Sequence, residues 1–401
     1  MVKLAEKEKC TGCSSCYNIC PVNAITMVED EEGFLRPQIN KDCTNCGLCS
    51  NVCPEISGFK PERSKNPIVY AAWSLDKSVR MKSSSGGIFS ILAEYALERG
   101  GVVFGAVFDE NLKVKHAPAL KVDDLSRFRG SKYVQSEIND SFRQIKKHLD
   151  GNKKVLFSGT PCQAAGLLSF LGKDYDNLIV CDVICHGVAS PKVFEGYLKY
   201  LHSTIGAKVT AISFREKCFG WNNPSVKLIF ENNRERVTPH NKDEFFMGFL
   251  NNMYLRPSCG ICRYATIPRI GDVTIGDFWR IGEDRKFEYD TFNGVSAVLI
   301  NSEKGSNVFN SCRDKYFRIE RELDEAVKYN MLTGFPSKPS KHRAGFFLIF
   351  NKKGFGKAAN KYLGRISLAK IIAKIIGPKG ANFIKLHAAA FISLIEGKRN
   401  R

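Results

Sequence analysis

Long apolar segments are missing from this chain. Its 401 residues include no run of eighteen apolar residues, and so a typical membrane-spanning helix is excluded. The residues before the first cysteine carry several charges but lack the apolar core of a secretory signal peptide. We therefore expect neither a transmembrane helix nor a signal peptide.

Signals for dinucleotide binding and base stacking are also missing or scarce. No Gly-x-Gly-x-x-Gly fingerprint occurs, and so direct use of NAD is not expected. The last forty residues contain three aromatic side chains, which is little for stacking on bases. No nucleic-acid partner is therefore expected, although the chain has a formal net charge of +19.

Cysteine, by contrast, is abundant and regularly spaced. Eight of the fifteen cysteines fall in the first 53 residues, in two copies of the pattern Cys-x-x-Cys-x-x-Cys-x-x-x-Cys-Pro. Bacterial ferredoxins hold cubane iron–sulfur clusters with this pattern, whereas zinc sites pair two Cys-x-x-Cys units and gain nothing from the further cysteines. Two 4Fe–4S clusters are therefore expected. The first copy is Cys10, Cys13, Cys16 and Cys20, and the second is Cys43, Cys46, Cys49 and Cys53.

The fourth cysteine of each copy is expected to bind the cluster of the other copy. Three thiolates of one loop can bind three irons of a cube, and in two-cluster ferredoxins the fourth thiolate binds the other cluster. The expected ligand sets are Cys10, Cys13, Cys16 and Cys53 for one cluster, and Cys43, Cys46, Cys49 and Cys20 for the other.

Charge and composition divide the chain into three expected parts. Residues 1–60 have a net charge of −2 and carry both cysteine patterns, which favours an α+β ferredoxin-like iron–sulfur domain held together by its clusters. Residues 61–340 are expected to form the catalytic domain. Residues 341–401 hold fourteen Lys or Arg against one acidic residue, a net charge of +13, and are expected to form a basic helical tail.

Strands and helices alternate in the expected catalytic domain. A strand at 69–73, a helix at 88–97 and a strand at 102–108 are followed by a strand at 154–158 and a helix at 162–170. This alternation is typical of an α/β domain with a largely parallel or mixed sheet.

Two loops of this domain have the composition of phosphate-binding turns. Residues 83–87 (Ser-Ser-Ser-Gly-Gly) precede a helix, where free N–H groups and the helix dipole favour an anion. Residues 129–133 (Arg-Gly-Ser-Lys-Tyr) offer a second such cluster together with an aromatic ring. An ordinary capped turn and a surface loop are the alternative interpretations.

Four cysteines of this domain stand at the ends of expected elements. Cys259 and Cys262 form a Cys-x-x-Cys unit, Cys162 lies near a helix N-terminus, where a thiolate is stabilised, and Cys185 follows a strand. Their convergence would hold a third cubane. Buried structural thiols are the alternative, because free cysteine is among the most buried residue types. Three other cysteines are interpreted as structural: Cys181, Cys218 and Cys312.

Several short motifs occur together in a fixed order. They are Ser84–Gly87, Arg129–Tyr133, Gly159–Gln163, Cys185–Gly187 with Ser190 and Pro191, Phe214 and Arg215 with Lys217, Gly220 and Trp221, Cys259–Cys262 and Arg269–Trp279. In this order they resemble the coenzyme F420 hydrogenase/dehydrogenase beta-subunit family. The resemblance covers about residues 1–310 and includes the N-terminal ferredoxin domain that many members carry.

The resemblance implies a flavin-binding domain, with FAD rather than FMN, and a third 4Fe–4S cluster in the central domain. The implied ligands of that cluster are Cys162, Cys185, Cys259 and Cys262, with Cys181 as the alternative to Cys185. The implied contacts of the flavin phosphates are Ser84, Ser85, Gly86 and Gly87, with Gly130, Ser131 and Lys132 as second contacts.

The leading interpretation is a flavin-dependent iron–sulfur oxidoreductase. It would take electrons from a ferredoxin-like or other redox partner and act on a small organic substrate, because flavin converts between single electrons and hydride. His186 and Lys217 are candidates for proton delivery or for polarising flavin and substrate, and a structural role is the alternative for each. Arg215, Arg269 and Asp277 are explained equally well by internal salt bridges.

Two other functions are kept open. One is a coenzyme F420 oxidoreductase subunit that feeds a hydrogenase or dehydrogenase, and the other is an electron-transfer subunit without a substrate site of its own. The resemblance also implies a setting in bacterial surface-polysaccharide synthesis, without naming a substrate.

The basic tail combines apolar residues at helical spacing with lysines. Basic amphipathic helices can lie on anionic membranes, and a helical hairpin packed on the catalytic domain is the alternative. Because fifteen thiols also indicate a reducing compartment, we expect a cytoplasmic protein with peripheral association at the inner face of the membrane. The apolar positions are Ile366, Leu368, Ile371, Ile372, Ile375 and Ile376, and the lysines are Lys370, Lys374 and Lys379.

Overall fold

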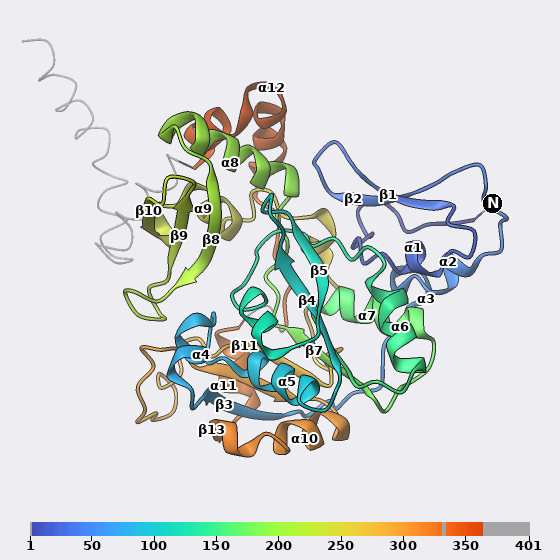
Figure 1. The fold of residues 1–401 in the computed structure, drawn as a ribbon. Helices are drawn as coiled ribbons and strands as arrows, with labels where there is room; N and C mark the ends of the chain where they lie inside the picture. The colour runs from blue at the N-terminus through green and yellow to red at the C-terminus, as the bar shows by residue number, and fades with distance from the viewer. Residues whose placement is uncertain (1, 331–333, 364–401) are drawn as a thin grey trace, which may run out of the picture.

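The structure is a computed structural model that describes residues 2–330 and 334–363. A small N-terminal lobe (residues 2–60) lies beside a larger α/β body, and a helix-rich cap with its own small sheet lies next to both (Figure 1). Among the described residues, the helices are too short or too polar to cross a bilayer.

The N-terminal lobe consists of a two-stranded antiparallel sheet and three short helices. Ile25 pairs with Ile39 at the open end of the hairpin. The hairpin turn carries Phe34, which is fully buried in the hydrophobic core of the cap. The elements are α1 (Ser15–Ile19), β1 (Ile25–Glu29), β2 (Leu35–Ile39), α2 (Leu48–Asn51) and α3 (Pro54–Ser57).

The α/β body is built on an eight-stranded sheet in the order β13-β3-β12-β11-β7-β6-β4-β5. The four strands β11, β7, β6 and β4 are parallel to one another, and the strands at both sides pair antiparallel. The sheet is therefore mixed. Its strands are β3 (Ile68–Ser74), β4 (Val102–Phe108), β5 (Val114–Ala119), β6 (Val155–Gly159), β7 (Leu178–Val183), β11 (Val273–Asp277), β12 (Ser296–Ile300) and β13 (Tyr316–Arg321).

Helices cover both faces of this sheet. Val103 and Val107 of β4 face one core, whereas Phe104 faces the other, because successive side chains of a strand point to opposite faces. Burial on both faces explains why these strands are nearly continuous apolar runs. The helices of the body are α4 (Lys77–Lys82), α5 (Ile88–Leu97), α6 (Ser141–Asp150), α7 (Pro161–Leu171), α10 (Glu303–Asn310) and α11 (Leu323–Lys328), with the short helices η1 (Val122–Arg127) and η4 (Arg313–Lys315).

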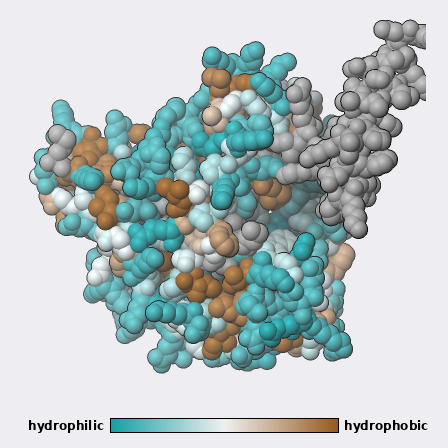
Figure 2. Space-filling model, turned by 180° about the vertical axis from the view of Figure 1, so that it is seen from behind, coloured by the Kyte–Doolittle hydropathy of each residue, from teal (hydrophilic) through white to brown (hydrophobic). Residues whose placement is uncertain are grey.

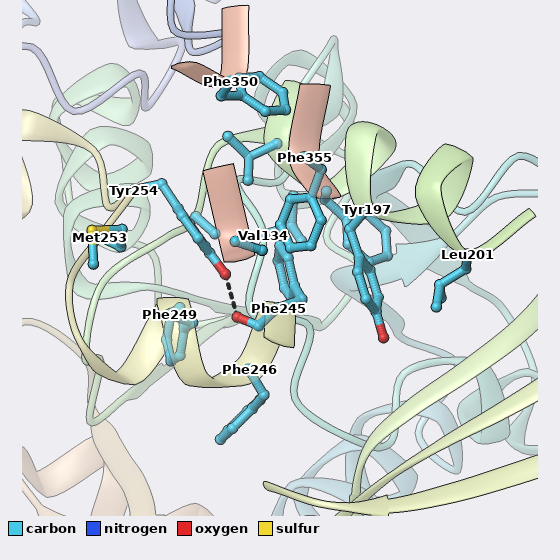
Figure 3. Packing of buried hydrophobic residues seen from close by; sticks show 14 of the residues in the cluster. Val134, Tyr197, Leu201, Phe245, Phe246, Phe249, Met253, Tyr254, Phe350 and Phe355 are labelled. Carbon is cyan, nitrogen blue, oxygen red and sulfur yellow. Dashed lines mark hydrogen bonds between the residues drawn. The ribbon is translucent and has the colours of Figure 1, made fainter. Parts of the chain in front are cut away.

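The cap has an aromatic core. Phe245 and Tyr197 stack with ring centroids 5.4 Å apart, and the Tyr254 hydroxyl donates a hydrogen bond to the carbonyl of Phe245 (Figure 3). The small sheet has the order β10-β9-β8. The elements are α8 (Pro191–Ile205), β8 (Val209–Glu216), β9 (Ser225–Phe230), β10 (Glu235–Pro239), η2 (His240–Lys242), α9 (Glu244–Leu250) and α12 (Arg343–Tyr362).

The first part of the predicted basic tail belongs to this core. Phe346, Phe350 and Phe355 of α12 are buried with residues of α8, and so the chain continues to pack in the core of the cap beyond the boundary expected at residue 341. The apolar and lysine positions expected to form an amphipathic helix, between Ile366 and Lys379, lie outside the described residues.

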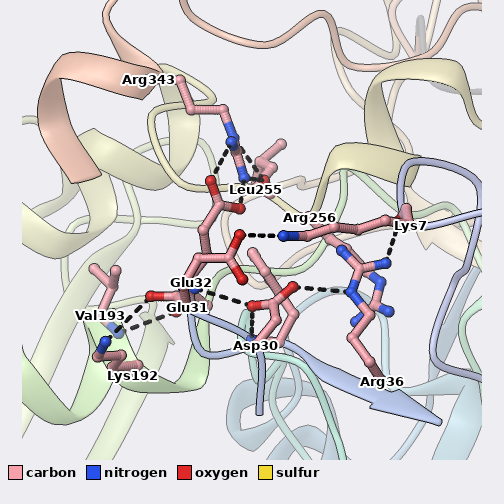
Figure 4. A network of polar contacts seen from close by, with 12 residues as sticks. Lys7, Asp30, Glu31, Glu32, Arg36, Lys192, Val193, Leu255, Arg256 and Arg343 are labelled. Atoms are coloured by element: carbon pink, nitrogen blue, oxygen red, sulfur yellow. Dashed lines mark hydrogen bonds and ion pairs between the residues drawn. The ribbon is translucent and has the colours of Figure 1, made fainter. Parts of the chain in front are cut away.

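Ion pairs and buried hydrogen bonds hold the N-terminal lobe against the rest of the molecule (Figure 4). Arg343 of α12 forms a bidentate ion pair with Glu32 in the hairpin turn, with one N–O distance of 2.7 Å. The same guanidinium donates to the carbonyl of Leu255 at 3.1 Å. On the other side of the lobe, Arg143 of α6 donates to the carbonyl of Cys20 at 3.0 Å. The lobe is therefore fixed from two directions.

Candidate iron–sulfur and cofactor site

The first cysteine loop is buried against helix α7 of the body. Cys10 and Cys13 are each 8% exposed, and the Ser15 hydroxyl donates to the carbonyl of Gly166 at 2.9 Å. A Cβ atom on Gly166 would lie 2.8 Å from Cys13 Cβ and 2.9 Å from its sulfur. Glycine is therefore required at this position for the loop to approach the helix so closely.

Cys53, the last cysteine of the second copy, lies with the first loop. Burial, together with the smaller effects of the Cys13 and Cys10 thiols, raises the pKa of Cys53 to about 12. Burial also raises the pKa of Cys16 well above its ordinary value, with contributions from the other three thiols. These four thiols (Cys10, Cys13, Cys16 and Cys53) form the first cysteine group. They are the set expected if the fourth cysteine of each copy binds the cluster of the other copy.

The second cysteine group (Cys43, Cys46 and Cys49) reaches the molecular surface, although Cys49 itself is buried. Cys46 is exposed and Cys43 is partly exposed. Burial raises the pKa of Cys49, and the other two thiols contribute. The Cys20 sulfur accepts a hydrogen bond from the backbone N–H of Ala24 at 3.2 Å. Apolar side chains gather on this lobe, at the left of Figure 2, where the exposed ones are Val22, Val28, Leu48 and Ile56.

The third cysteine group brings together Cys162, Cys185, Cys259 and Cys262. Burial raises the pKa of Cys162 well above its ordinary value, and the other three thiols contribute. Burial raises the pKa of Cys259 to about 11, with a further contribution from Cys262. Cys181, the alternative ligand, instead lies fully buried in the core that faces α5. The structure therefore brings Cys185 rather than Cys181 to the group.

The topology explains how the third group forms. A proline and a capping box start α7, and so Cys162 lies in its first turn, directly after β6. Cys185 follows β7, which is the parallel neighbour of β6. The carboxyl ends of parallel strands lie at one edge of a sheet, which brings these two cysteines together. Cys259 and Cys262 are added from the short helix η3 (Pro257–Ile261) and the residue after it.

The first and third groups are neighbours. Cys162 and Gly166 are one turn apart on α7, about 6 Å along the helix axis, and Cys13 lies against Gly166. Between the groups, the Tyr264 hydroxyl donates to Glu55 Oε1 at 2.6 Å. Burial raises the pKa of Tyr264, and Glu55 and one thiol from each group raise it further. Tyr264 is therefore within electrostatic reach of both groups.

None of these groups has the spacing of ligands to a single ion. In the part of the chain that the structure describes, no three His, Cys, Asp or Glu side chains meet closely enough to hold one metal ion. The four thiolates of a cubane bind four different irons, and so they stand further apart than the ligands of one ion.

A cavity of about 810 Å³ opens at the edge of the sheet that carries the third group. This volume is within the range of sites for cofactors and other small molecules. Cys162 and Cys185 form part of its wall, and Ser84, Ser131 and Trp279 form other parts. The cavity therefore adjoins the third cysteine group.

The two loops predicted to bind phosphate meet at this cavity. The hydroxyl oxygens of Ser84 and Ser131 are 2.9 Å apart, and the backbone N–H of Ser131 donates to Ser84 Oγ at 2.7 Å. Gly87 is the N-cap of α5, with a φ of 91° and no capping side chain. Because the Ser90 N–H donates to the carbonyl of Gly87 at 3.2 Å, the N–H groups of Ile88 and Phe89 are the ones in the first turn of α5 that can meet an anion in the cavity.

Other residues predicted to contact the phosphates mainly hold the loops in place. The Ser85 hydroxyl donates to the carbonyl of Val295 at 2.7 Å, and the Gly86 N–H donates to a serine hydroxyl of β12 at 2.9 Å. Lys132 Nζ donates to three backbone carbonyls of residues 128–130, each at 3.1 Å. Burial lowers the pKa of Lys132 to about 7.

His186, one of the two predicted catalytic residues, lines the cavity directly after Cys185. Its Nε2 lies 2.7 Å from Asn252 Oδ1, and the amide nitrogen of Asn252 donates to the carbonyl of Lys338 at 2.8 Å. Because that bond turns the amide oxygen toward the ring, Nε2 carries the hydrogen. Burial lowers the pKa of His186, and the bond to Asn252 partly offsets this effect.

Lys217, the other predicted catalytic residue, lies behind the first serine loop. Among the described residues that line the cavity, Lys217 is not found. Its Nζ donates to the carbonyls of Arg80, Ser85 and Asn293 at 2.7, 2.6 and 2.7 Å. Burial, together with the smaller effect of the Arg215 charge, lowers the pKa of Lys217 to about 7. This geometry favours a positioning role for Lys217.

An ion pair on the cavity wall is supported by two tryptophans. Arg215 forms two hydrogen bonds with the Asp277 carboxylate, at 2.8 and 2.9 Å, and the Trp221 indole donates to the same carboxylate at 2.6 Å. Trp279 stacks on Trp221 with ring centroids 5.1 Å apart. The salt-bridge interpretation of Arg215 is therefore the one that the structure shows. Arg269 likewise pairs with a buried aspartate, Asp182, at 3.0 Å.

Three residues near the site have no counterpart among the predicted site residues. Tyr264 and Arg256 lie at the junction of the cysteine groups, and His240 lines the cavity. Arg256 and Tyr264 flank the Cys-x-x-Cys unit at 259–262. Their closeness in sequence to this unit could have identified Arg256 and Tyr264 as site residues, whereas the sequence around His240 contains no such signal.

The fold and the cysteine groups first define a class of protein: a ferredoxin-like iron–sulfur domain followed by an α/β domain with a mixed sheet. The family model for the 4Fe–4S dicluster domain matches residues 9–56. Models for the N-terminal and C-terminal parts of the coenzyme F420 hydrogenase/dehydrogenase beta subunit match residues 69–143 and 152–325, together more than half of the chain. The protein belongs to the coenzyme F420 hydrogenase/dehydrogenase beta-subunit family, and it is an iron–sulfur electron-transfer protein of this type.

Among solved structures, the chain is similar to a chain of the F420-reducing NiFe hydrogenase complex from Methanosarcina barkeri, in a xenon-derivatised form. The two share 18% identity with a TM-score of 0.45, and the similarity covers 68% of this chain and 91% of that chain. No curated protein matches the sequence significantly.

Proposed function

We propose that this protein connects iron–sulfur clusters to a flavin and exchanges reducing equivalents between a redox partner and coenzyme F420. The observation that carries the proposal is the position of the third cysteine group. Cys162 and Cys185 lie on the wall of the cavity, and the first group adjoins them one turn further along α7. Membership of the family makes coenzyme F420 the first organic substrate to test.

The residues of the three groups fit iron–sulfur clusters. A metal-bound thiol is deprotonated, and donors to the sulfurs stabilise thiolates and tune cluster potentials. Such donors are present: the backbone N–H of Ala24 donates to Cys20 Sγ at 3.2 Å, and Nη2 of Arg256 lies 3.6 Å from Cys10 Sγ. The proposed ligands are the first group, the second group with Cys20, and the third group.

The cavity fits a flavin with its phosphates on the serine loops. Ser84, Ser131 and the uncapped first turn of α5 offer hydroxyl and N–H donors on the cavity wall, and Cys162 and Cys185 of the third group form another part of that wall. When bound, a flavin exchanges single electrons for hydride. The volume of about 810 Å³ is large enough for FAD, the flavin that we propose.

His186 is the proposed proton-handling residue. It lines the cavity next to a proposed cluster ligand, and its ring is held by Asn252 at 2.7 Å. Burial lowers the pKa of His186, and the hydrogen bond to Asn252 places a proton on Nε2. Lys217 is proposed to hold the first serine loop in place through its three carbonyl contacts rather than to meet the substrate.

Flavin binding and deazaflavin turnover test the proposal. The anaerobically reconstituted protein is titrated with FAD and with FMN, and reduction of coenzyme F420 is then followed by absorbance with reduced viologen as electron donor. Ser131→Asp places a negative charge where the phosphates are proposed to lie, and we expect FAD to bind roughly tenfold more weakly or worse, about 1.4 kcal/mol. Ser126→Asp, on an exposed turn of η1, is the matched control and should bind normally.

The outcomes separate the candidate functions. Bound FAD with F420 turnover supports the proposal. Bound FAD without turnover excludes coenzyme F420 as the substrate and favours a flavin-dependent enzyme with another organic substrate. Absence of flavin binding contradicts the proposal and favours an electron-transfer subunit without a substrate site of its own.

A further inference from the structure

Arg256 is a buried arginine at the junction of the first and third cysteine groups. Its side chain is 1% exposed. Nε donates to the carbonyl of Cys10 at 2.8 Å, and Nη2 donates to the carbonyl of Leu35 at 3.0 Å and lies 3.6 Å from Cys10 Sγ. Arg256 also begins the turn that carries Cys259, whose N–H donates to the Arg256 carbonyl at 3.0 Å.

The positive charge of Arg256 has no carboxylate partner. Three other buried arginines pair with aspartates: Arg36 with Asp30, Arg215 with Asp277 and Arg269 with Asp182. Within residues 2–330 and 334–363, no ion pair includes Arg256. A buried unpaired charge is costly, and so another negative group must compensate it. The negative groups within its electrostatic reach are the thiolate forms of Cys10 and Cys259.

Two donors without partners point at the first cysteine loop. In the described structure, Arg256 Nη1 and Gln135 Nε2 are buried and make no hydrogen bond. A Cβ atom on Gly12 would lie 2.9 Å from that Nη1 and 2.5 Å from that Nε2. Both donors therefore face the segment between Cys10 and Cys13, which belongs to the proposed binding loop of the first cluster.

We propose that Arg256 is a counter-charge shared by two clusters and that it raises the reduction potential of both. The two are the first cluster, held by the first cysteine group, and the central cluster, held by the third cysteine group. The part that concerns the central cluster rests on the proposed function. A cubane with four thiolate ligands is anionic and gains one more negative charge on reduction, and so a nearby fixed cation stabilises the reduced form more than the oxidised form. Arg256 is a positioning and tuning residue, since it acts on the clusters and not on the substrate.

The test compares Arg256→Gln with Arg256→Lys in the reconstituted full-length protein. Midpoint potentials are measured by redox titration monitored by electron paramagnetic resonance, and iron is counted in each sample. For Arg256→Gln we expect the reduced-to-oxidised ratio of the first and central clusters at a fixed potential to fall about tenfold, which is about 59 mV for a one-electron couple. The surface cluster of the second group should be unchanged. Arg256→Lys retains the charge at a shorter reach and should shift the same two ratios by roughly threefold.

Arg143→Gln is the matched control. Arg143 also fixes the N-terminal lobe through backbone carbonyls, at 3.0 Å from Cys20 O, but its side chain is one-third exposed. This variant should keep the potentials of the first and central clusters. Unchanged potentials in Arg256→Gln with full iron, or an equal shift in Arg143→Gln, would overturn the proposal. If Arg256→Gln does not assemble, Arg256→Met is titrated in its place, and unchanged potentials in that variant overturn the proposal.

The iron count separates this proposal from the proposed function. About eight irons per chain in the unaltered protein would remove the central cluster, and with it that part of the proposed function. The shift of the first cluster would then still decide the role of Arg256.

Discussion

The two cysteine loops of the N-terminal lobe share one sequence pattern but have different surroundings. Cys13 of the first loop packs on α7 and is 8% exposed, whereas Cys46 of the second loop lies at the surface. The first loop also contacts Arg256, which is 246 residues away in the sequence. The pattern specifies that each loop holds a cluster, and the packing around the loop decides which cluster faces the body and which faces solvent.

Replacing the fourth cysteine of each loop with serine should give the largest difference between the loops, because each variant is expected to lose a different cluster. Cys53 lies with the first group, and so we expect Cys53→Ser to remove the inward-facing cluster, whereas Cys20→Ser should remove the surface cluster. Each variant should lose about four irons per chain. Iron analysis measures the loss, and the resonance signal of magnetically coupled clusters identifies which cluster is missing.

The two variants should then differ in that coupling. Cys20→Ser should retain coupling between the inward-facing cluster and the central cluster, and Cys53→Ser should lose it. The opposite pattern would show that each loop keeps its own fourth cysteine.

Close packing of the first loop on α7 predicts a substantial loss of stability from one added methyl group. In Gly166→Ala, the new Cβ would lie 2.8 Å from Cys13 Cβ, and such overpacking costs about 1–3 kcal/mol. The unfolding midpoint should fall, and limited proteolysis of the lobe should accelerate. Gly151→Ala at the end of α6 is the control, because its Cβ would meet nothing closer than 3.3 Å. Equal midpoints for both variants would contradict the described contact.

The lobe and the body should also differ in their response to pH. Residues 1–60 contain no histidine, whereas burial in the body lowers the pKa of His116 to about 4. Between pH 6.5 and 4 the unfolded state binds a proton that the folded state does not, and so stability falls as the pH falls. His116 should contribute about 1 kcal/mol of this loss between pH 7.5 and 5.5.

Unfolding midpoints at these two pH values test the assignment to His116. His116→Gln should reduce the difference between the midpoints, and His202→Gln, at an exposed position of α8, should leave it unchanged. An unchanged difference in His116→Gln would contradict the prediction.

The hydrogen bond between Tyr264 and Glu55 joins the body to the lobe and should have the smallest effect on stability. Tyr264→Phe removes a bond of 2.6 Å, which is worth about 1 kcal/mol. The control is Tyr175→Phe, which removes a similar bond to Asp150, at 2.7 Å. Thermal unfolding should show comparable losses, but faster proteolysis of the lobe is expected for Tyr264→Phe alone. Equal proteolysis would remove the proposed role of Tyr264 in docking.

The ferredoxin-like domain and the alternation of strands and helices could be predicted because their signals are local. Each cysteine loop fits within one short segment, and apolar runs mark the strands of a sheet that is covered on both faces. The third cysteine group combines residues from positions 162 to 262. From the residues alone it remained one of two interpretations, because its formation depends on which strands are neighbours.

Long-range contacts account for what could not be predicted. Lysine is a residue type that often acts in catalysis, and so Lys217 was a candidate. Its three carbonyl acceptors, however, belong to residues 80, 85 and 293, and no local sequence pattern predicts these contacts. No local pattern predicts the contact of Arg256 either, because its partner Cys10 lies 246 residues earlier in the chain. The aromatic residues at 346, 350 and 355 were a usable signal that the start of the basic tail belongs to a core.

The central claim is that the third cysteine group holds a cluster next to the inward-facing cluster of the lobe. Its most direct test is the iron content of the anaerobically reconstituted protein, compared with Cys162→Ser and with the structural control Cys181→Ser. We expect about twelve irons per chain in the unaltered protein and in Cys181→Ser, and about eight in Cys162→Ser. About eight irons in all three proteins would contradict the claim.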